Sequence, residues 1–325
     1  MKAHAIRFRR TGGPEVLEWE ETDIGEPGPG ELRVRQTAIG VNFIDIYHRS
    51  GLYPVALPSG LGSEGAGVVD AVGQDVVEFK PGDRVAYGTG PLGAYADVRI
   101  MPARHAVKLP DSISERQAAG MMLRGMTAQY LLRRTYRVQP GDHVLIHAAA
   151  GGVGLILVQW AKHLGATVIG TAGSPQKAEI ARRHGADHVI LYGKEDFPSK
   201  VRDLTDGEGV HVVYDGVGKA TFMGSLDCLK LRGMMVSFGN ASGAVPPLDL
   251  LLLSRKGSLY VTRPTLASYT ATREELLESA GELFDVVGSG AVKIEVGQSF
   301  PLERAAEAHR ALESRQTTGS TILVP

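Results

Sequence analysis

Residues 143–163 read HVLIHAAAGGVGLILVQWAKH, and this stretch decides the fold. It opens with an apolar run that predicts a strand, passes through a glycine-rich turn, and continues as a helix from Gly152. Compared with the pattern G-x-G-x-x-G, Ala149 replaces the first glycine, Gly151 is the second and Gly154 is the third. Such a turn lets the backbone approach a pyrophosphate, which free amides at the helix N-terminus would bind. The alternative is a turn whose glycines serve only packing, and the elements that follow favour the cofactor.

Strands and helices alternate on the C-terminal side of this stretch. Ser174-Pro175 offers an N-cap followed by a proline at the first helical position, which is typical of a helix start. This alternation implies parallel βαβ units, and six strands fit one doubly wound dinucleotide-binding domain over residues 125–262. The predicted strands are 143–149, 166–172, 188–191, 210–215, 233–238 and 257–262, and the predicted helices are 152–163, 175–184 and 219–229.

The first third of the chain has a different pattern. Residues 31–38 alternate apolar with polar side chains, and residues 65–73 form an apolar run bounded by glycines. Helical periods are nearly absent before Ser114, so residues 1–124 are expected to be all-β and barrel-like. The tail, residues 263–325, contains two helical stretches and a final strand at 320–324. It does not extend the alternation, and we expect it to complete the first domain.

Composition limits the classes of function. A chain of 325 residues suggests about two domains at ~150 residues each. Lys plus Arg is 35 and Asp plus Glu is 36, so the net charge of −1 gives no general attraction to nucleic acid or an anionic membrane. The single cysteine, Cys228, fits a reducing compartment and excludes an intrachain disulfide or a zinc lobe with four thiolates. No targeting segment or membrane span is visible, and we expect a cytoplasmic protein.

The end of the second strand of the predicted nucleotide domain indicates which cofactor is bound. An acid there would read the ribose 2′-hydroxyl of NAD, but the strand ends at Ala172 without one. Lys177 and Tyr192 follow nearby and could pair with a 2′-phosphate. Taken singly, each could be an ordinary surface side chain. Together with the missing acid they favour NADPH.

Several segments, in this order and spacing, resemble one known family. They are residues 40–45 (GVNFID), 51–54 (GLYP), 58–67 (PSGLGSEGAG), 80–85 (KPGDRV), 147–154 (HAAAGGVG) and 237–240 (SFGN). The chain resembles the zinc-independent quinone oxidoreductases, the zeta-crystallin-like branch of the medium-chain dehydrogenase/reductase superfamily, over essentially its whole length. The resemblance implies an α/β protein with two domains. A GroES-like β-barrel catalytic domain would comprise residues 1–124 and 263–325, and a Rossmann-type NADPH-binding domain would comprise residues 125–262, with the cofactor in the cleft.

The positions of the zinc ligands differ from those of zinc-dependent relatives. In the zinc alcohol dehydrogenases a cysteine occupies the position of Asn42 and a histidine that of Ser63. Catalytic zinc requires about three protein ligands, and His48, His105 and the other histidines show no paired spacing. We therefore expect no metal.

The resemblance also implies which side chains form the site. The catalytic candidates are Asn42, Asp45 and Tyr53. Asp45 could instead be a buried hydrogen-bond partner, Tyr53 a loop anchor, and Phe238 a core residue. The cofactor-binding candidates are Asn42, Tyr47, Thr127, Ala150, Gly151, Gly152, Val153, Gly173, Ser174, Lys177, Tyr192, Gly216, Phe238, Gly239, Asn240 and Arg315.

The expected reaction is hydride transfer from NADPH to a quinone or a related small electrophilic acceptor; single-electron transfer is the variant known in the family. No nucleophile–base pair stands out, and the cofactor carries the difficult chemistry. The enzymatic alternative is an enone, 2-alkenal or enoyl reductase, in which Tyr53 would matter as a proton donor. The non-catalytic alternative is an RNA-binding or crystallin-type protein, but the chain lacks the clustered basic and aromatic stretches that are typical of RNA binding.

We also expect a homodimer paired through the edge strand 257–262, unless the tail covers that edge.

Overall fold

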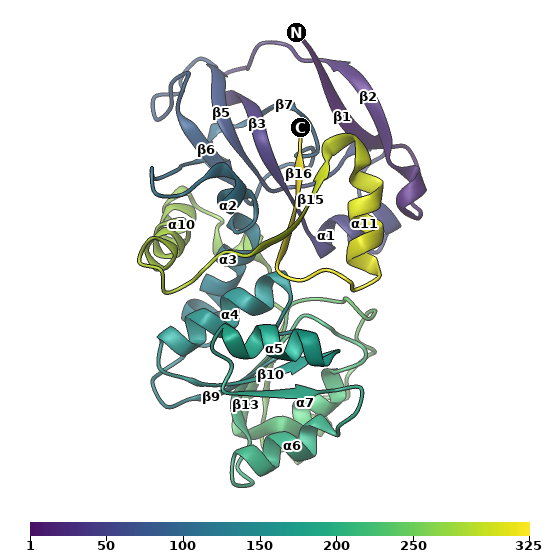
Figure 1. Ribbon diagram of the computed structural model, residues 1–325, viewed down its shortest axis with the longest axis vertical. Coiled ribbons are helices and arrows are strands. Elements are labelled where there is room, and N and C mark those ends of the chain that lie inside the picture. Colours follow the sequence, from purple (N-terminus) through teal and green to yellow (C-terminus); the bar gives the residue numbers. More distant parts are fainter. The chain divides into compact units, whose positions relative to one another are not determined.

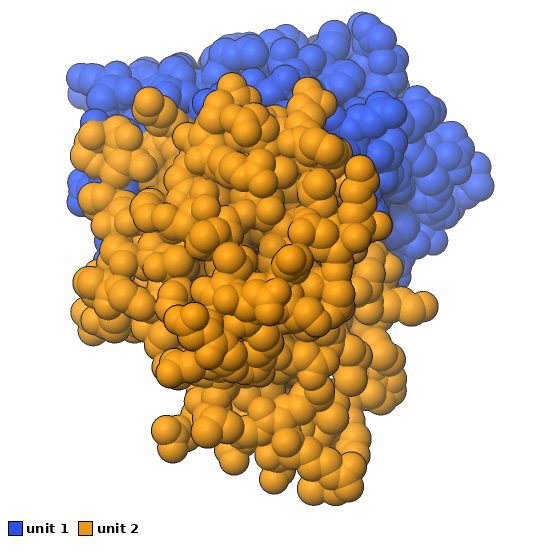
Figure 2. All heavy atoms as spheres, turned by 60° about the horizontal axis from the view of Figure 1, so that its bottom comes forward, with its two compact units in different colours: residues 1–126, 270–288, 294–325 blue, residues 127–269, 289–293 orange.

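Two separate sets of strands organise the computed structural model, which describes residues 1–325. Unit 1 comprises Met1–Met126, Thr270–Gly288 and Ile294–Pro325, and unit 2 comprises Thr127–Tyr269 and Ser289–Lys293 (Figure 2). The boundaries expected from sequence lie at residues 124 and 262. In the structure the first boundary lies after residue 126 and the second after residue 269, so both come later in the chain than expected. Residues 289–293 return to unit 2.

Unit 2 is built on one parallel sheet of six strands. Its order is β11-β10-β9-β12-β13-β14, which is the 3-2-1-4-5-6 order of a doubly wound dinucleotide-binding fold. The prediction of a doubly wound domain is confirmed. The strands are β9 (His143–Ile146), β10 (Thr167–Ala172), β11 (His188–Leu191), β12 (Val210–Asp215), β13 (Leu229–Ser237) and β14 (Tyr260–Thr262).

The helices of unit 2 follow its strands, as Figure 1 shows for α4 to α7. Ser174 caps α5 by accepting the N–H of Lys177, and Pro175 occupies its first turn. Asp196 caps α6 in the same way, a start signal that the sequence prediction missed. The helices are α4 (Gly152–His163), α5 (Pro175–Arg183), α6 (Phe197–Leu204), α7 (Phe222–Cys228), α8 (Leu251–Arg255) and α9 (Leu266–Tyr269), and α3 (Met122–Tyr130) continues into a π-helical turn at Leu131–Thr135.

Unit 1 contains the barrel. Seven strands form one sheet, β15-β16-β3-β5-β6-β8 with β7 paired to β3, and β2-β1-β4 form a second. The tail strand β16 pairs antiparallel with β3 through Thr321 and Val41, so the C-terminal segment completes this sheet. The strands are β1 (Lys2–Phe8), β2 (Glu18–Asp23), β3 (Glu31–Val41), β4 (Ser59–Gly60), β5 (Gly65–Val72), β6 (Arg84–Tyr87), β7 (Val98–Pro102), β8 (Val107–Lys108), β15 (Val296–Pro301) and β16 (Ser320–Val324).

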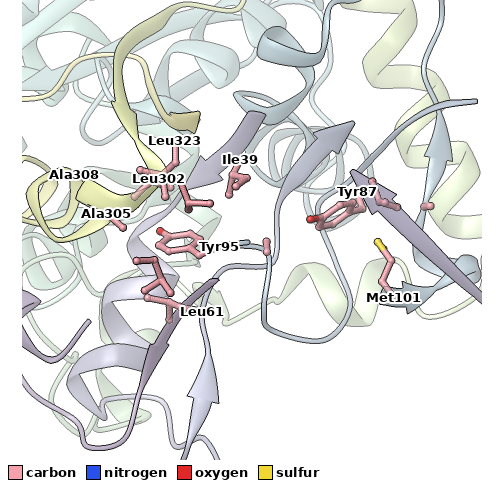
Figure 3. Packing of buried hydrophobic residues seen from close by; sticks show 14 of the residues in the cluster. Ile39, Leu61, Tyr87, Tyr95, Met101, Leu302, Ala305, Ala308 and Leu323 are labelled. Carbon is pink, nitrogen blue, oxygen red and sulfur yellow. The ribbon is translucent and has the colours of Figure 1, made fainter. Parts of the chain in front are cut away.

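The core of unit 1 combines side chains from both ends of the chain. The rings of Tyr87 and Tyr95 are fully buried among aliphatic neighbours, and helix α11 (Ala305–Glu313) packs Ala305 and Ala308 against the same cluster (Figure 3). This unit also contains the helices α2 (Glu115–Ala119) and α10 (Arg273–Gly288).

The expectation that residues 1–124 are all-β is wrong at α1 (Phe43–Ser50), which is a helix, and at the end of this range, where α2 and the start of α3 lie. The carboxylate of Asp45 accepts the backbone N–H of Asn42 at 2.8 Å, and Gly51 ends the helix with a φ of +84°. Eight residues are too few for a helical period to stand out beside two β-branched isoleucines. The capping residues Asn42, Asp45 and Gly51 were the signals in the sequence from which this helix could have been predicted.

No helix of the chain is both long enough and apolar enough to cross a membrane.

Candidate cofactor and active site

The loop after β9 leads directly into the N-terminus of α4. Gly151 is the N-cap and no side chain caps the helix, so its first-turn amides are left for another acceptor. A Cβ on Gly154 would lie 2.2 Å from the carbonyl oxygen of Ala148, so only glycine lets the helix start this close to the loop. An uncapped helix start lined by Gly151, Gly152 and Val153 fits the phosphate groups of a dinucleotide.

The end of β10 is small and carries no acid. Ala172 is buried, and the hydroxyl of Tyr192, which follows β11, would lie 3.0 Å from a Cβ on Gly173. Tyr192 is itself 37% exposed, and Lys177 is half-buried in the first turn of α5. The structure thus brings Gly173 and Tyr192 together, with Ser174 and Lys177 at the adjoining helix start.

A third group of predicted residues meets after β12 and β13. A Cβ on Gly216 would lie 3.0 Å from the ring of Phe238, and one on Gly239 would lie 2.5 Å from the carbonyl oxygen of Gly216. Asp215 holds the turn, since its Oδ1 accepts the N–H groups of Val217 and Gly218. Phe238 and the following Asn240 are both half-buried. These loops lie at the carboxyl ends of parallel strands, where doubly wound sheets bind ligands.

In unit 1, Asn42 belongs to a buried polar cluster. Its Nδ2 donates to Oε2 of Glu64 at 2.7 Å, and the guanidinium of Arg124 lies 3.3 Å from the same carboxylate oxygen. The backbone N–H of Leu123 donates to the other oxygen at 2.8 Å. Burial raises the pKa of the Glu64 carboxyl, while Arg124 and Asn42 act in the opposite direction. The sequence prediction did not single out Glu64 or Arg124, which form this cluster with Asn42. The available signal was that Glu64 follows Ser63, a position at which the zinc enzymes carry a ligand.

Asp45 is completely buried. Its Oδ2 accepts hydrogen bonds from the Asn42 N–H and from the Tyr95 hydroxyl at 3.0 Å, and its Oδ1 has no hydrogen-bond partner. Burial raises the pKa of the Asp45 carboxyl to about 7. A 0% exposed carboxyl favours the reading of Asp45 as a hydrogen-bond partner that supports the loop of Asn42. Direct contact with a substrate stays a prediction.

Tyr53 lies in the loop after α1, against an aromatic cluster. Its ring centroid is 5.1 Å from that of Tyr47 and 6.0 Å from that of His48, and its N–H donates to the carbonyl of Tyr47. Phe43 extends the cluster, 6.3 Å from Tyr47. Tyr47 is 8% exposed, whereas Tyr53 is half-buried and more open to a ligand.

The remaining predicted residues fall into different units. Thr127 is buried in α3 and belongs to unit 2, with Ala150 and the other cofactor candidates of the glycine loop. Arg315 is exposed at the end of α11 in unit 1, with a φ of +58°. Their contacts with a cofactor stay predictions.

Metal-ligating side chains are not clustered in this structure. No three His, Cys, Asp or Glu residues lie close enough together to hold a metal ion. Asn42 is buried against Glu64, and Ser63 is half-buried.

The barrel and the doubly wound sheet together define a two-domain dehydrogenase/reductase fold. Residues 28–111 match the family "Alcohol dehydrogenase GroES-like domain" and residues 152–282 match "Zinc-binding dehydrogenase". The chain is 57% identical to a quinone oxidoreductase of Pseudomonas aeruginosa, covering 99% of this chain and 100% of that protein. It therefore belongs to the quinone oxidoreductase family of the medium-chain dehydrogenase/reductase superfamily, whose members are oxidoreductases.

Two further relatives bear on function. The crystal structure of Escherichia coli quinone oxidoreductase complexed with NADPH has a TM-score of 0.98 and 52% identity, covering 99% of this chain and 100% of that one. A 2-haloacrylate reductase from Burkholderia sp. is 49% identical over 99% of this chain and 98% of that protein. These matches confirm the expected family, the GroES-like domain and the Rossmann-type domain.

Proposed function

We propose that this protein is an NADPH-dependent quinone oxidoreductase that works without zinc. The observation that carries the cofactor assignment is the uncapped, glycine-lined start of α4 beside a β10 that ends in Ala172 without an acid. The names of the relatives at 57% and 52% identity support a quinone as the acceptor.

The residues of unit 2 fit NADPH at three places. The α4 start, from Ala150 to Val153, would bind the pyrophosphate. Gly173, Ser174, Lys177 and Tyr192 would surround the 2′-phosphate, to which a lysine and a phenol can both donate. Gly216, Phe238, Gly239 and Asn240, with Thr127, would line the nicotinamide end.

In unit 1 the side chains position an acceptor rather than react with it. When bound, NADPH supplies a hydride that converts a quinone into an aromatic anion, which water can protonate. Asn42 would offer a polar contact in an orientation fixed by Glu64. Tyr53 would orient the acceptor against the aromatic cluster of Tyr47. Because the product anion is already stable, no dedicated proton donor is required.

The same arrangement suits reduction of an activated C=C bond, and the 2-haloacrylate reductase relative is the specific reason to keep this second candidate. Hydride addition to the β-carbon leaves an α-carbanion that must be protonated. Tyr53 would then serve as the donor, and its hydroxyl would be essential.

A homodimer is part of the proposal. β14 forms one edge of the parallel sheet, and the tail strands β15 and β16 pair within the other sheet rather than over this edge. Tyr260 on β14 is 59% exposed, and Leu231 on the neighbouring β13 is 69% exposed. An apolar sheet edge of this kind favours pairing with a second copy.

We also propose a cytoplasmic location, which a single buried cysteine fits.

The test is a screen of NADPH oxidation against quinones, enones and 2-haloacrylates, repeated with Tyr53→Phe. We expect the largest kcat/KM with a quinone, and Tyr53→Phe should stay within about tenfold of wild type, since an orienting contact costs less than ~1.4 kcal/mol of barrier. Loss of a true general acid would cost ~10²–10⁴. A Tyr53→Phe enzyme that is inactive, or an enone that outperforms every quinone, would transfer the assignment to the C=C reductase.

A further inference from the structure

A buried polar cluster joins the carboxyl ends of three neighbouring strands in unit 2. His147 directly follows β9, Thr171 is the penultimate residue of β10, and Asp215 is the last residue of β12. Thr221 and Ser225, before and within α7, complete the cluster. Of the five side chains only that of Asp215 has a role above, in the turn after β12, and each belongs to a residue no more than 3% exposed.

The imidazole of His147 is the centre of this cluster. Its Nδ1 lies 2.9 Å from the Thr171 hydroxyl, and its Nε2 lies 2.9 Å from the Ser225 hydroxyl. The ring therefore connects β9 with β10 on one side and with α7 on the other. The imidazole and the ring of Phe197 also pack in a T-shaped arrangement, with the ring centroids 5.1 Å apart.

The connection continues to the third strand through Asp215. The Thr221 hydroxyl donates to its Oδ2 at 2.7 Å. The Ser225 hydroxyl donates to the Thr221 carbonyl at 2.8 Å and lies 3.4 Å from the same Oδ2. The other oxygen, Oδ1, accepts the N–H groups of Val217 and Gly218 at 2.7 and 3.0 Å. The hydrogen bonds thus run from the glycine loop after β9 to the turn after β12.

The two ring nitrogens of histidine suit the central position of this cluster. Burial lowers the pKa of the His147 imidazole against the raising effect of the Asp215 carboxylate, and this favours the neutral ring. A neutral imidazole carries one N–H donor and one acceptor nitrogen, and a hydroxyl can serve either of them. Both nitrogens are therefore satisfied in a site that water does not reach, where an unpaired polar atom would be costly.

The backbone beside His147 adopts a conformation that needs support. Ala148 has a φ of +52°, the left-handed region that a residue with a Cβ rarely adopts. The residues on both sides are anchored, because the His147 N–H donates to the Tyr214 carbonyl and the Ala149 N–H donates to the Thr171 carbonyl. Thr171 thus binds both the side chain of His147 and the backbone of the loop.

We propose that His147 is a positioning residue that holds the loops after β9, β10 and β12 in the arrangement that binds NADPH. This inference rests on the proposed function. His147 itself is 2% exposed. It acts through the loop at Ala148–Gly151, through Ala172–Ser174, which follow Thr171, and through Gly216–Gly218, which Asp215 holds.

The decisive experiment measures NADPH binding directly, by the change in NADPH fluorescence, in His147→Phe. This variant keeps an aromatic ring against Phe197 and removes both hydrogen bonds. We expect the Kd for NADPH to rise about tenfold. The kcat with saturating NADPH and quinone should change less than threefold or so, because misplaced binding loops weaken the ground and transition states alike. The matched control is Thr205→Val, which removes a buried hydroxyl bonded to Val201 and Gly209 in the same unit, at the opposite end of β12; its Kd should match wild type.

Three further variants separate positioning from mere stability. Thr171→Val and Ser225→Ala each remove one partner and should each raise the Kd, while Thr171→Val should add nothing in the His147→Phe background. His147→Gln, which places an amide near Ser225, should recover part of the affinity. If His147→Phe does not fold, the two partner variants decide the question.

A Kd within twofold of wild type in folded His147→Phe, or in both partner variants, would overturn the inference while leaving the proposed function intact. Wild-type protein that fails to bind NADPH would overturn the proposed function, and this inference with it.

Discussion

Asp45 shows how the surroundings of one residue determine its role. Its sequence neighbours suit either a catalytic acid or a buried hydrogen-bond partner. In the structure the carboxyl receives the Asn42 N–H and the Tyr95 hydroxyl, and Tyr95 in turn contacts Nε2 of His309 at 3.1 Å. Arg49 donates to Nδ1 of that histidine, so the imidazole is neutral, consistent with a pKa lowered to about 3 by burial. This chain of bonds supports Asp45 from α11.

The raised pKa of Asp45 predicts a pH-dependent stability. The folded carboxyl, with a pKa of about 7 against an ordinary 3.8, keeps its proton at pH values where the unfolded chain has lost it. Wild type therefore loses stability as the pH rises from about 4 to about 7, by at most ~4 kcal/mol for this group. Asp45→Asn lacks this penalty, so its stability relative to wild type should increase across that window and level off above it.

Urea unfolding at several pH values measures this difference. Asp70→Asn is the control of opposite sign, because the hydrogen bond from Arg33 lowers the pKa of Asp70. That variant should lose stability relative to wild type as the pH rises through the acid range. A difference between Asp45→Asn and wild type that does not vary with pH would contradict a raised Asp45 pKa.

Substitution of the single residue Lys177 tests the preference for NADPH over NADH. If its ammonium pairs with the 2′-phosphate, Lys177→Ala should raise the Kd for NADPH by one to two orders of magnitude, roughly, since a charge-assisted contact contributes about 1.5–3 kcal/mol. NADH lacks that phosphate, and its Kd should barely change. Lys200→Ala, a substitution of an exposed lysine in α6, is the control. Equal losses for both cofactors would refute the assignment.

Among the secondary-structure elements, β14 carries the clearest consequence. It pairs only with β13 and presents Tyr260 at the sheet edge. Tyr260→Glu combined with Leu231→Glu should convert a dimer into a monomer in light scattering at micromolar concentration, because a second copy would have to bury both charges. Val77→Glu, at a residue 93% exposed in unit 1, should leave the mass unchanged. A monomer mass for wild type would rule the dimer out.

At the scale of the whole molecule, the absence of zinc from the proposed mechanism can be measured. Elemental analysis of the purified protein should find no stoichiometric metal, and chelator should leave quinone reduction unchanged. The reason is local, because Asn42 and Ser63 offer an amide and a hydroxyl where zinc enzymes carry a thiolate and an imidazole. If chelator removed stoichiometric zinc and activity was lost with it, residues other than Asn42 and Ser63 would have to bind the metal.

The sequence alone determined the parallel α/β domain and its glycine loop, because these depend on local patterns. Apolar strands followed by helices specify βαβ units within about thirty residues, and the glycine-rich turn around Gly151 marks the junction of one strand and one helix. Short elements were harder to predict from the sequence. Helix α1 is eight residues long, so its capping box and Gly51 were stronger signals than its periodicity.

Only the tertiary structure decided how distant residues combine. Asn42, Glu64 and Arg124 are up to 82 positions apart, and His147 meets Thr171 and Ser225 from two other elements. A buried polar side chain must find a partner wherever the fold supplies one, and no local pattern records which partner that is. The state of such groups follows from burial: the same Asp45 that would be an ordinary surface acid holds its proton to about pH 7 because the core excludes water from it.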